Sequence, residues 1–385
     1  MTQAAAAGQP LIVRGHGTKA TLGRPPALGD VLDLSGLSGV TLYEPEELVL
    51  SAMAGTPLAD VEAMLAAHDQ MLAFEPAHLA ALLDPQATGA GTMGGLFAAN
   101  LAGPRRISAG AVRDHALGVR AVSGRGEVFK SGGRVVKNVT GYDLPRLLAG
   151  SFGTLAVLTE VTLKVLPRPP EAETVLLPGL GWAAAARAMS AAMGSSCEVS
   201  GAAYVPEALA GRIPGLPGAA VLLRLEGFAP SVRARRGMLE DVLRPFGSTE
   251  GLVGEASAAA WAAVRDVAPF QGSDSVLWRL STAPIAGPGL AEVLVALLGG
   301  DAFCDWAGGL VWLALPGPDP AAEAVRAALA PHGGHATLIR APEEARLRTA
   351  VFQPQEPGLA ALSRRVKAAF DPVGVLNPGR MHAGV

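Results

Sequence analysis

Short runs of alternating apolar and polar residues in the first part of the chain predict strands joined by tight turns. Apolar positions at helical spacing predict a helix over Leu58–His68, and Leu144–Leu148 allows a shorter one. We expect strands at Leu11–Val13, Val31–Leu34, Val40–Tyr43, Val49–Ala54, Gly118–Val122, Glu127–Phe129 and Leu155–Val165.

From Glu171 to about Arg340, helical and strand patterns alternate, which predicts an antiparallel α+β unit. The segments VLLRLEG and VLWRLST resemble each other and each precedes a predicted helix, so we infer a weak internal duplication. Expected helices are Trp182–Met193, Ser231–Leu243, Ala258–Val267, Gly289–Leu298 and Ala321–Leu329; expected strands are Ala202–Val205, Ala220–Leu225, Val276–Ser281, Gly309–Leu315 and Ala336–Arg340.

The Pro-rich run Pro167–Pro170 predicts a linker, and a last helix over Gly358–Phe370 ends at Asp371-Pro372. Turn signals of the Asp-Pro and Asn-Pro-Gly kind follow that helix. We therefore predict three parts: a first domain at residues 1–168, an α+β cap at 169–341, and a C-terminal helix and tail at 342–385.

Composition narrows the function classes. The net charge is −3 and the basic residues are scattered, which argues against a nucleic-acid partner. We expect no secretory signal and no transmembrane segment, hence a cytoplasmic protein, with peripheral contact to the inner membrane through partner subunits left open. Cys197 and Cys304 lie far apart in the sequence, so this chain's thiols alone cannot build a zinc or iron–sulfur site, and we predict no metal site.

Two glycine-rich stretches carry the candidate chemistry. Arg14–Lys19, RGHGTK, follows an apolar run, and successive backbone N–H groups in such a turn suit a pyrophosphate. Taken alone, this loop is better explained as an ordinary strand-to-loop turn, and only the second glycine-rich stretch favours a cofactor site. The second stretch, DPQATGAGTMGGLFAANLAG from Asp84, contains a formal GxGxxG at Gly89–Gly94. A Pro-containing loop precedes it where the Rossmann fingerprint needs a buried strand, so we interpret both stretches as a different kind of cofactor cradle.

The order RGHGTK, GTMGG with Asn100 and Gly103, GYDLPRLLAGSFGTL and FDPVGVLNPGR resembles the FAD-binding type-4 family, also called the vanillyl-alcohol oxidase or PCMH-type fold. The similarity in order and spacing extends over nearly the whole chain. It implies a two-lobed FAD-binding domain, an antiparallel α+β cap and a C-terminal tail that returns to the FAD-binding domain. The segments VVKNVTGYDLPRLLAGSFGTL and HATLIR look like the FAD-binding subunit of glycolate oxidase complexes.

The resemblance also implies a set of FAD-binding residues. The first loop would wrap the pyrophosphate, the second stretch would line the ribityl chain and flavin edge, a third segment would run beside the adenine, and Asn377 and Arg380 would reach the flavin face. The residues so implied are Arg14, Gly15, His16, Gly17, Thr18, Lys19, Thr92, Gly94, Gly95, Asn100, Gly103, Ala111, Asp114, Gly153, Leu155, Val157 and Asn377.

Departures from the family pattern matter too. Relatives that bond FAD covalently through the first loop carry His where this chain has Thr18, so we expect non-covalent FAD. Where relatives have an aromatic residue before the glycine of their RYG-like element, this chain has Ala109 before Gly110. The Glu and the Gly of the relatives' GSEGTLG element are replaced here by Phe152 and Ala156. The HxGDGNxH element that holds a metal and orients substrate in catalytic relatives is reduced to His332-Gly333-Gly334-His335, which has neither the acid nor the asparagine.

Alcohol oxidation at a flavin needs a cation for the substrate carboxylate and a base for the hydroxyl proton. Arg279, Arg340 or Arg380 could supply the cation, or could form surface salt bridges. His332 and His335 could act as base or be remnants of the family element. Lys137, Tyr142 and Asp143 form a polar cluster, or a turn in which Asp143 caps a helix. We select Arg380, Arg340, His335 and Tyr142 as candidate catalytic residues.

The resemblance implies an FAD-binding subunit of a glycolate oxidase complex that converts glycolate to glyoxylate. Its partners would be a catalytic FAD subunit and an iron–sulfur subunit. Two alternatives stay open: a self-sufficient FAD-dependent dehydrogenase of a small 2-hydroxy acid, and a structural subunit whose flavin stabilises the fold.

Overall fold

The computed structural model describes residues 1–84, 86, 89–134 and 141–383. They form two compact units, and both units are discontinuous in sequence. The first unit contains Met1–Ala102, Gly110–Arg168 and Ala350–Val385; the second contains Gly103–Ala109 and Pro169–Thr349. The mixed α/β class and the antiparallel sheets confirm the predicted fold class.

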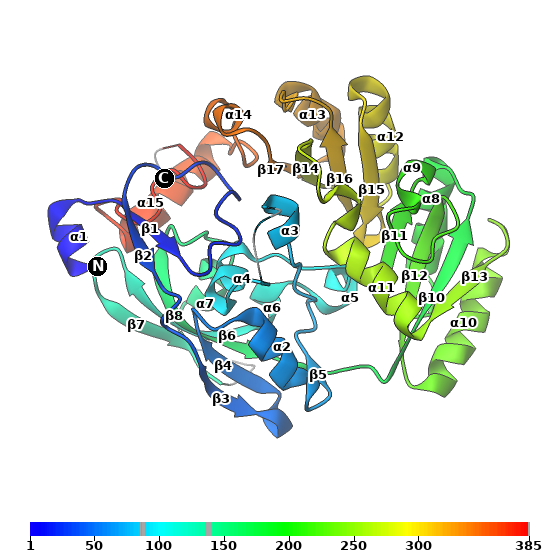
Figure 1. Ribbon diagram of the computed structural model, residues 1–385, viewed down its shortest axis with the longest axis horizontal. Coiled ribbons are helices and arrows are strands. Elements are labelled where there is room, and N and C mark those ends of the chain that lie inside the picture. The colour runs from blue at the N-terminus through cyan, green and yellow to red at the C-terminus, as the bar shows by residue number, and fades with distance from the viewer. Residues whose placement is uncertain (85, 87–88, 135–140, 384–385) are drawn as a thin grey trace. The chain divides into compact units, whose positions relative to one another are not determined.

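A five-stranded antiparallel sheet organises the first unit, in the order β3-β4-β8-β6-β7 (Figure 1). The alternating sequence explains these strands, because successive side chains point to opposite faces. Their bounds are β3 Val40–Glu44, β4 Val49–Met53, β6 Ala116–Ser123, β7 Val128–Gly132 and β8 Ala156–Lys164. The predicted hairpin is β6 and β7, closed where the Ser123 N–H donates to the Glu127 carbonyl at 2.9 Å.

Helices bury the apolar face of this sheet. The core contains Leu50 and Val161 of the sheet together with Phe97 of α4 and Phe74 of a connecting loop, all fully buried. The helices of the first unit are α1 Thr2–Ala7, α2 Leu58–Ala66, α3 Ala80–Leu83, α4 Met93–Ala99, α6 Val112–His115, α7 Leu144–Leu148 and α15 Pro357–Phe370. A small pair, β5 Gln70–Met71 and β9 Leu166–Pro167, completes this layer.

A parallel pair of strands, β1 Leu11–Arg14 and β2 Asp30–Asp33, receives the C-terminal tail. The Leu11 N–H donates to the Val375 carbonyl at 2.7 Å, and the Asn377 N–H donates to the Leu11 carbonyl at 2.9 Å. This pairing confirms that the tail returns to the unit that carries the first glycine-rich loop.

A buried ion pair fixes the turn that sends the tail back. The Asp371 carboxylate accepts a hydrogen bond from the Lys367 ammonium at 2.7 Å, and the backbone N–H groups of Gly374, Val375 and Leu376 donate to the same carboxylate. Lys367 also donates to the Thr154 carbonyl at 2.7 Å. The Asp-Pro turn signal therefore marks a turn built around a buried carboxylate.

The second unit is an eight-stranded antiparallel sheet in the order β13-β10-β12-β11-β15-β16-β14-β17 (Figure 1). Its strands are β10 Glu171–Pro178, β11 Gly201–Val205, β12 Ala220–Gly227, β13 Glu250–Val253, β14 Val276–Ser281, β15 Asp301–Asp305, β16 Leu310–Leu315 and β17 His335–Arg340. Its helices are α5 Arg106–Ala109, α8 Trp182–Met193, α9 Glu207–Ala210, α10 Ala229–Leu243, α11 Gly254–Arg265, α12 Gly287–Leu298, α13 Ala322–Leu329 and α14 Glu343–Arg348.

The sheet consists of two βαββαβ repeats. The first runs β10-α8-β11-β12-α10-β13 and the second runs β14-α12-β15-β16-α13-β17, and the strand order of the sheet is symmetric about the β11–β15 contact. The strands that correspond in the two repeats are not those that the sequence similarity suggested. VLLRLEG forms the third strand of its repeat and VLWRLST forms the first strand of the other, so the two similar segments do not occupy equivalent positions.

The two faces of this sheet are packed differently. Trp182 of α8 contacts Tyr204, and Arg326 of α13 lies over Trp278, so these helices cover one face. On the opposite face, the indole of Trp261 from α11 donates to Thr174 at 2.8 Å. The pairing register places Arg279, Thr337 and Asp305 on this second face as well.

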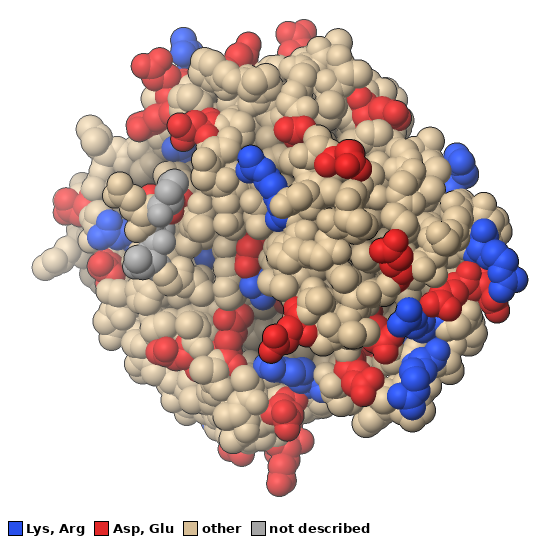
Figure 2. All heavy atoms as spheres, turned by 45° about the vertical axis from the view of Figure 1, so that its right-hand side comes forward, with Lys and Arg blue, Asp and Glu red and all other residues tan. Residues whose placement is uncertain are grey.

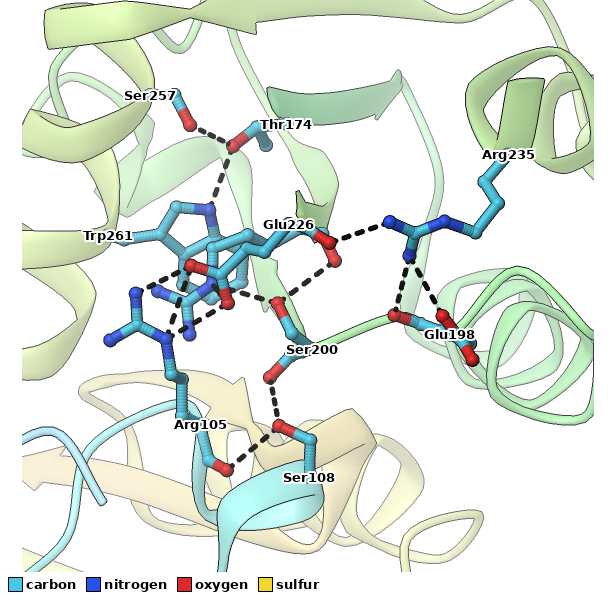
Figure 3. Close-up of polar contacts among 10 residues, drawn as sticks. Arg105, Ser108, Thr174, Glu198, Ser200, Glu226, Arg235, Ser257 and Trp261 are labelled. Carbon is cyan, nitrogen blue, oxygen red and sulfur yellow. Dashed lines mark hydrogen bonds and ion pairs between the residues drawn. The ribbon is translucent and has the colours of Figure 1, made fainter. Parts of the chain in front are cut away.

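A polar network holds the Gly103–Ala109 segment in the second unit (Figure 3). Arg105 donates to both carboxylate oxygens of Glu226, at 2.6 and 2.9 Å, and Ser108 donates to the Ser200 carbonyl at 3.1 Å. Arg224 lies on the ring of Trp261 and 3.5 Å from Glu226. These contacts explain why a short segment that follows α4 in sequence belongs to the second unit.

Charged residues of both signs are interspersed on one face of the molecule. Figure 2 shows Lys and Arg side chains among Asp and Glu side chains over the face it displays. Within the described part of the chain, no helix is both long and apolar enough to cross a membrane.

Candidate functional site

The first glycine-rich loop lines a cavity of about 310 Å³ in the first unit. The loop enters directly from β1, so the parallel strand pair fixes its start. Thr92, Gly95 and Ala98 line the cavity from α4 and its N-cap, and Asn377 and Arg380 line it from the tail. Three segments that are distant in sequence therefore meet where the sequence predicted a cofactor cradle.

Two glycines allow these segments to approach closely. A Cβ on Gly15 would lie 2.6 Å from Oγ1 of Thr92. Gly91 has φ +90°, and a Cβ there would lie 2.7 Å from Oγ1 of Thr18 and 3.1 Å from Nζ of Lys19. Both positions require glycine because no side chain fits between the loops.

Lys19 places a positive charge in the wall of the cavity. Its ammonium donates no hydrogen bond to any residue that the structure describes. Burial lowers the pKa of Lys19 to about 8, so the group is still mostly protonated at neutral pH. A buried ammonium without a partner is costly, and an anionic ligand would satisfy it.

A smaller cavity of about 80 Å³ is lined in part by the same residues, including Gly15, Gly95 and Asn377. Asn377 has φ +40° and bridges two segments: its Oδ1 accepts from the Val13 N–H at 2.9 Å, and its Nδ2 donates to the Phe152 carbonyl at 2.8 Å. A Cβ on Gly153 would lie 2.8 Å from Nδ2 of Asn377. The tail amide thereby ties β1 to the Gly153 turn beside both cavities.

Sequence reasoning missed three residues that line both cavities, Val13, Ala98 and Phe152. Ala98 follows Gly95 by three positions on α4, so helical spacing from a predicted residue indicates it. Phe152 has φ +53°, a conformation that bulky residues rarely adopt, and its sequence gives no such signal.

Only some of the other residues predicted to bind the cofactor line one of the two cavities. Arg14 and His16 are exposed and line the larger cavity, Gly17 and Thr18 line it too, and Gly94 lines the smaller one. The remaining predicted residues line neither cavity: Asn100, Gly103, Ala111, Asp114, Leu155 and Val157.

Four of these residues take part in hydrogen bonds within the protein. The Asn100 side chain accepts from the Arg113 N–H at 3.0 Å, and the Asp114 carboxylate accepts from the Ala111 N–H at 2.9 Å. The Gly103 carbonyl accepts from the Trp306 indole at 3.0 Å within the second unit. Leu155 and Val157 are part of the apolar cores.

The two arginines selected as candidate carboxylate ligands both donate hydrogen bonds to backbone carbonyls. Arg380 donates to the carbonyls of Lys19 at 3.0 Å and Ala20 at 2.8 Å, and so closes the tail over the first loop. Arg340 donates to the carbonyls of Ser275 and Phe270 at 2.9 and 3.1 Å. Both groups therefore already satisfy backbone carbonyls, and their catalytic role stays a prediction.

His335 and Tyr142 lie in different units. His335 begins β17, and partial desolvation together with the charges of Arg279 and Arg106 lowers its pKa, so the ring is neutral at pH 7. Tyr142 is 90 % exposed. Beside it, the Asp143 side chain accepts a hydrogen bond from the Arg146 N–H at 3.2 Å and caps α7, as expected if this cluster is a helix-capping turn. Lys137, the third residue of the cluster, lies outside the described residues.

Within the described ranges, no group of three or more His, Cys, Asp or Glu side chains is arranged to hold a metal ion. Cys304 is buried beside Asp305, and burial raises the pKa of its thiol far above the ordinary value.

Comparison with known proteins identifies the class. Residues 1–132 match the family described as an FAD binding domain. The solved structure of p-cresol methylhydroxylase with substrate bound superposes with a TM-score of 0.71 and 15% identity, over 98% of this chain and 85% of that one. Alkyldihydroxyacetonephosphate synthase superposes with a TM-score of 0.66 and 17% identity, over 98% of this chain and 74% of that one. These superpositions show the fold, and the matched family model identifies an FAD binding domain in the first part of the chain.

A full-length relative narrows this class to a family. The glycolate oxidase subunit GlcE of Escherichia coli (strain K12) is 36% identical over 100% of this chain and 95% of its own length. The chain therefore belongs to the family of FAD-binding flavoproteins that includes this subunit. The glycolate oxidase subunit GlcD of Bacillus subtilis (strain 168) is 32% identical over 43% of this chain and 34% of its own length.

The cavity residues fit FAD. The Lys19 ammonium would neutralise one phosphate charge, and the close contacts at Gly15 and Gly91 leave backbone rather than side chains along the cavity wall. Bound there, FAD would supply two-electron redox chemistry. The chain's own residues would hold its phosphates and position it through the tail amide of Asn377.

Proposed function

We propose that this chain is the FAD-binding subunit of a glycolate oxidase complex. In this proposal it binds FAD non-covalently in the first-unit cavity and exchanges electrons with a catalytic flavoprotein subunit and an iron–sulfur subunit. The observation that carries the proposal is the buried Lys19 ammonium, which lines the glycine-walled cavity and has no hydrogen-bond partner among the described residues. The full-length similarity to a glycolate oxidase subunit supports the assignment to such a complex.

The degraded cap motif favours an accessory role over independent catalysis. His332-Gly333-Gly334-His335 has no acid and no asparagine, whereas the corresponding element of self-sufficient relatives contains both. His332 and His335 are both exposed, and the Gly333 carbonyl accepts from Thr282 at 3.1 Å. These features support a turn at the start of β17.

An anaerobic titration of the purified, FAD-loaded chain with glycolate and with D-lactate tests the proposal. We expect the oxidised-flavin absorbance to persist with either acid and to fall only after a partner flavoprotein subunit is added. Rapid bleaching of the isolated chain would refute the accessory role and favour a self-sufficient dehydrogenase. Purification of the chain with no partner subunit from its native cells would contradict membership in a complex.

A further inference from the structure

The five-stranded sheet of the first unit has a polar face opposite the apolar face that the helices bury. The strand register places Ser51 of β4 and Gly118 of β6 on either side of Thr162 of β8. Directly paired residues share one face of a sheet, whereas successive residues alternate between the faces. Val161, the neighbour of Thr162, belongs to the apolar core. The other three residues therefore form one row on the face away from that core.

Glycines open a hollow at one end of this row. Gly118 pairs with Gly132 of β7, and Gly132 has φ +73°, a conformation that favours glycine. There the chain turns back over β6: the Gly133 N–H donates to the Leu117 carbonyl at 3.1 Å, and a Cβ on Gly118 would lie 3.0 Å from the Gly133 nitrogen. The row thus lines a cavity of about 260 Å³. Since one water molecule takes up roughly 30 Å³, this cavity has room for a small organic molecule.

A buried pair of hydroxyl groups forms the polar floor of this cavity. Oγ of Ser51 and Oγ1 of Thr162 lie 2.7 Å apart, and the two residues are only 4% and 7% exposed. One hydroxyl donates to the other, so the pair has a second O–H group to donate. No residue that the structure describes accepts it. A buried donor needs an acceptor, and an oxygen atom of a bound ligand would supply one.

The described side chains around the cavity carry a net positive charge. Three cations line it, Arg120, Lys130 and Arg134, and Glu160 is the one acid among the described lining residues. Nε of Arg120 lies 3.5 Å from the Glu160 carboxylate, which also accepts from Thr41 at 3.0 Å. Neither the Lys130 ammonium nor the Arg134 guanidinium forms an ion pair or hydrogen bond with a described residue. Two positive charges at the cavity are therefore not compensated by these side chains.

We propose that this cavity binds the phosphate group of a small phosphate monoester. Such a group carries close to two negative charges at pH 7, which matches the two uncompensated cations. Its three terminal oxygens accept hydrogen bonds from ammonium, guanidinium and hydroxyl donors, all of which line the cavity. No residue lines both this cavity and the glycine-lined cavity proposed for FAD. The chain would thus have a second ligand site, and this inference does not depend on the proposed function.

Calorimetric titration of the FAD-loaded chain in phosphate-free buffer tests the site, with glycerol 3-phosphate as the probe. We expect saturable binding of one molecule per chain, no binding of uncharged glycerol, and an affinity for glycerol 3-phosphate at least equal to that for inorganic phosphate. Because the second proton of a phosphate monoester leaves near roughly pH 6, the affinity should increase several-fold when the pH is raised from about 5 to about 7.

A charge variant and a matched control test the role of the two uncompensated cations. Lys130→Met/Arg134→Met is expected to weaken binding of glycerol 3-phosphate about 10- to 100-fold, the range for hydrogen bonds to charged groups. Arg364→Met/Arg365→Met removes two positive charges from exposed positions of α15 in the same unit and should bind as the wild type does. Both variants should keep the flavin content of the wild type, because none of the four residues lines the FAD cavity.

A second variant tests the floor of the cavity independently of charge. Ser51→Ala/Thr162→Val removes both hydroxyls, so neither is left buried without a partner, and the protein should fold normally. Loss of the O–H donor should weaken binding of glycerol 3-phosphate by up to roughly tenfold. If the hydroxyl pair served only to join β4 and β8, this variant would bind the probe as the wild type does.

Three results would overturn the proposal: no binding of glycerol 3-phosphate by the wild type, wild-type affinity in the charge variant and the hydroxyl variant, or equal weakening in the α15 control. A lipid headgroup is another source of the same phosphate chemistry. We expect the chain to sediment no better with phosphatidylcholine vesicles that contain phosphatidic acid than with pure phosphatidylcholine vesicles. Sedimentation with the anionic vesicles, without binding of glycerol 3-phosphate, would also contradict the proposed site.

Discussion

Asp371→Ala tests how the C-terminal tail completes the FAD cavity. The substitution removes the carboxylate that accepts from Lys367 at 2.7 Å and from the N–H groups of Gly374, Val375 and Leu376 at 3.0, 3.1 and 2.8 Å. Removing one member of a buried ion pair costs about 3–5 kcal/mol, because the other charge stays buried without its partner. The Lys367 ammonium keeps two carbonyl acceptors, Thr154 and Leu376.

We therefore expect the free energy of unfolding of the first unit to fall by about 4 kcal/mol, or roughly 10 °C in melting temperature. Urea unfolding followed by circular dichroism measures the loss. FAD affinity should fall in parallel, because Asn377 lies in the same tail and bridges Val13 and Phe152 at the cavity. Fluorescence titration of the FAD-depleted protein measures that change.

Two controls separate the mechanism from general damage. The double variant Lys367→Met/Asp371→Leu removes both charges and should recover the part of the stability that the unpaired ammonium costs. It should not recover the part that is lost because the N–H groups of Gly374, Val375 and Leu376 have no acceptor. Glu344→Ala breaks an exposed pair with Arg348 and should leave stability unchanged. A loss below about 1 kcal/mol for Asp371→Ala, or a double variant as unstable as the single one, would refute the reasoning.

Further predictions concern one charge in each unit. Lys19→Met should weaken FAD binding about 10- to 100-fold. In a pH series of FAD titrations, the FAD affinity of the wild type should decline above pH 8, where Lys19 loses its proton, and the affinity of Lys19→Met should not. The control Lys130→Met, at an exposed strand position, should change neither the affinity nor its pH dependence. Because the folded pKa of Lys19 lies below its unfolded value of 10.5, the FAD-free wild type should gain stability between about pH 8 and pH 10.5, and Lys19→Met should not. Burial raises the pKa of Glu226, but the hydrogen bond from Arg105 and the charges of Arg224 and Arg105 outweigh it, so the net pKa is lowered. The contribution of Glu226 to the free energy of unfolding should be fully present above the pKa of the unfolded carboxyl, and it should be lost as the pH falls through the lower pKa of the folded carboxyl. Glu226→Gln should lower the free energy of unfolding by about 3 kcal/mol at pH 7, measured by urea unfolding.

Local patterns in the sequence predicted much of the fold. The β6–β7 hairpin and the strand β8 follow from alternation and turn residues, which act over a few positions. The two βαββαβ repeats could not be recognised because β10, β13 and β15 were not predicted as strands. β10 begins directly after the Pro-rich linker, and β13 and β15 are short, with few alternating positions.

The site could be predicted only as far as backbone chemistry determines it. Glycine-rich loops indicate close approach, and the structure brings both loops to one cavity. The sequence led us to select Arg380 and Arg340 over Arg279, and it could not show that both contact backbone carbonyls, because those carbonyls come from residues up to 361 positions away. Likewise, nothing local indicates that Gly103–Ala109 packs in the second unit, since Arg105 and Glu226 meet across 121 positions.

The central claim is that FAD occupies the cavity beside α4, and Gly95→Leu tests it most directly. Gly95 lines both cavities, and a Cβ there meets only Oγ1 of Thr92, at 3.3 Å, so a leucine side chain would fill the cofactor space without displacing the protein core. Gly237→Leu is the matched control, because that helical glycine in α10 is exposed and has no atom within 4 Å of its Cβ position. The account predicts a colourless, folded Gly95→Leu protein and a yellow Gly237→Leu protein with wild-type flavin content; a yellow Gly95→Leu protein that retains FAD at wild-type affinity would contradict it.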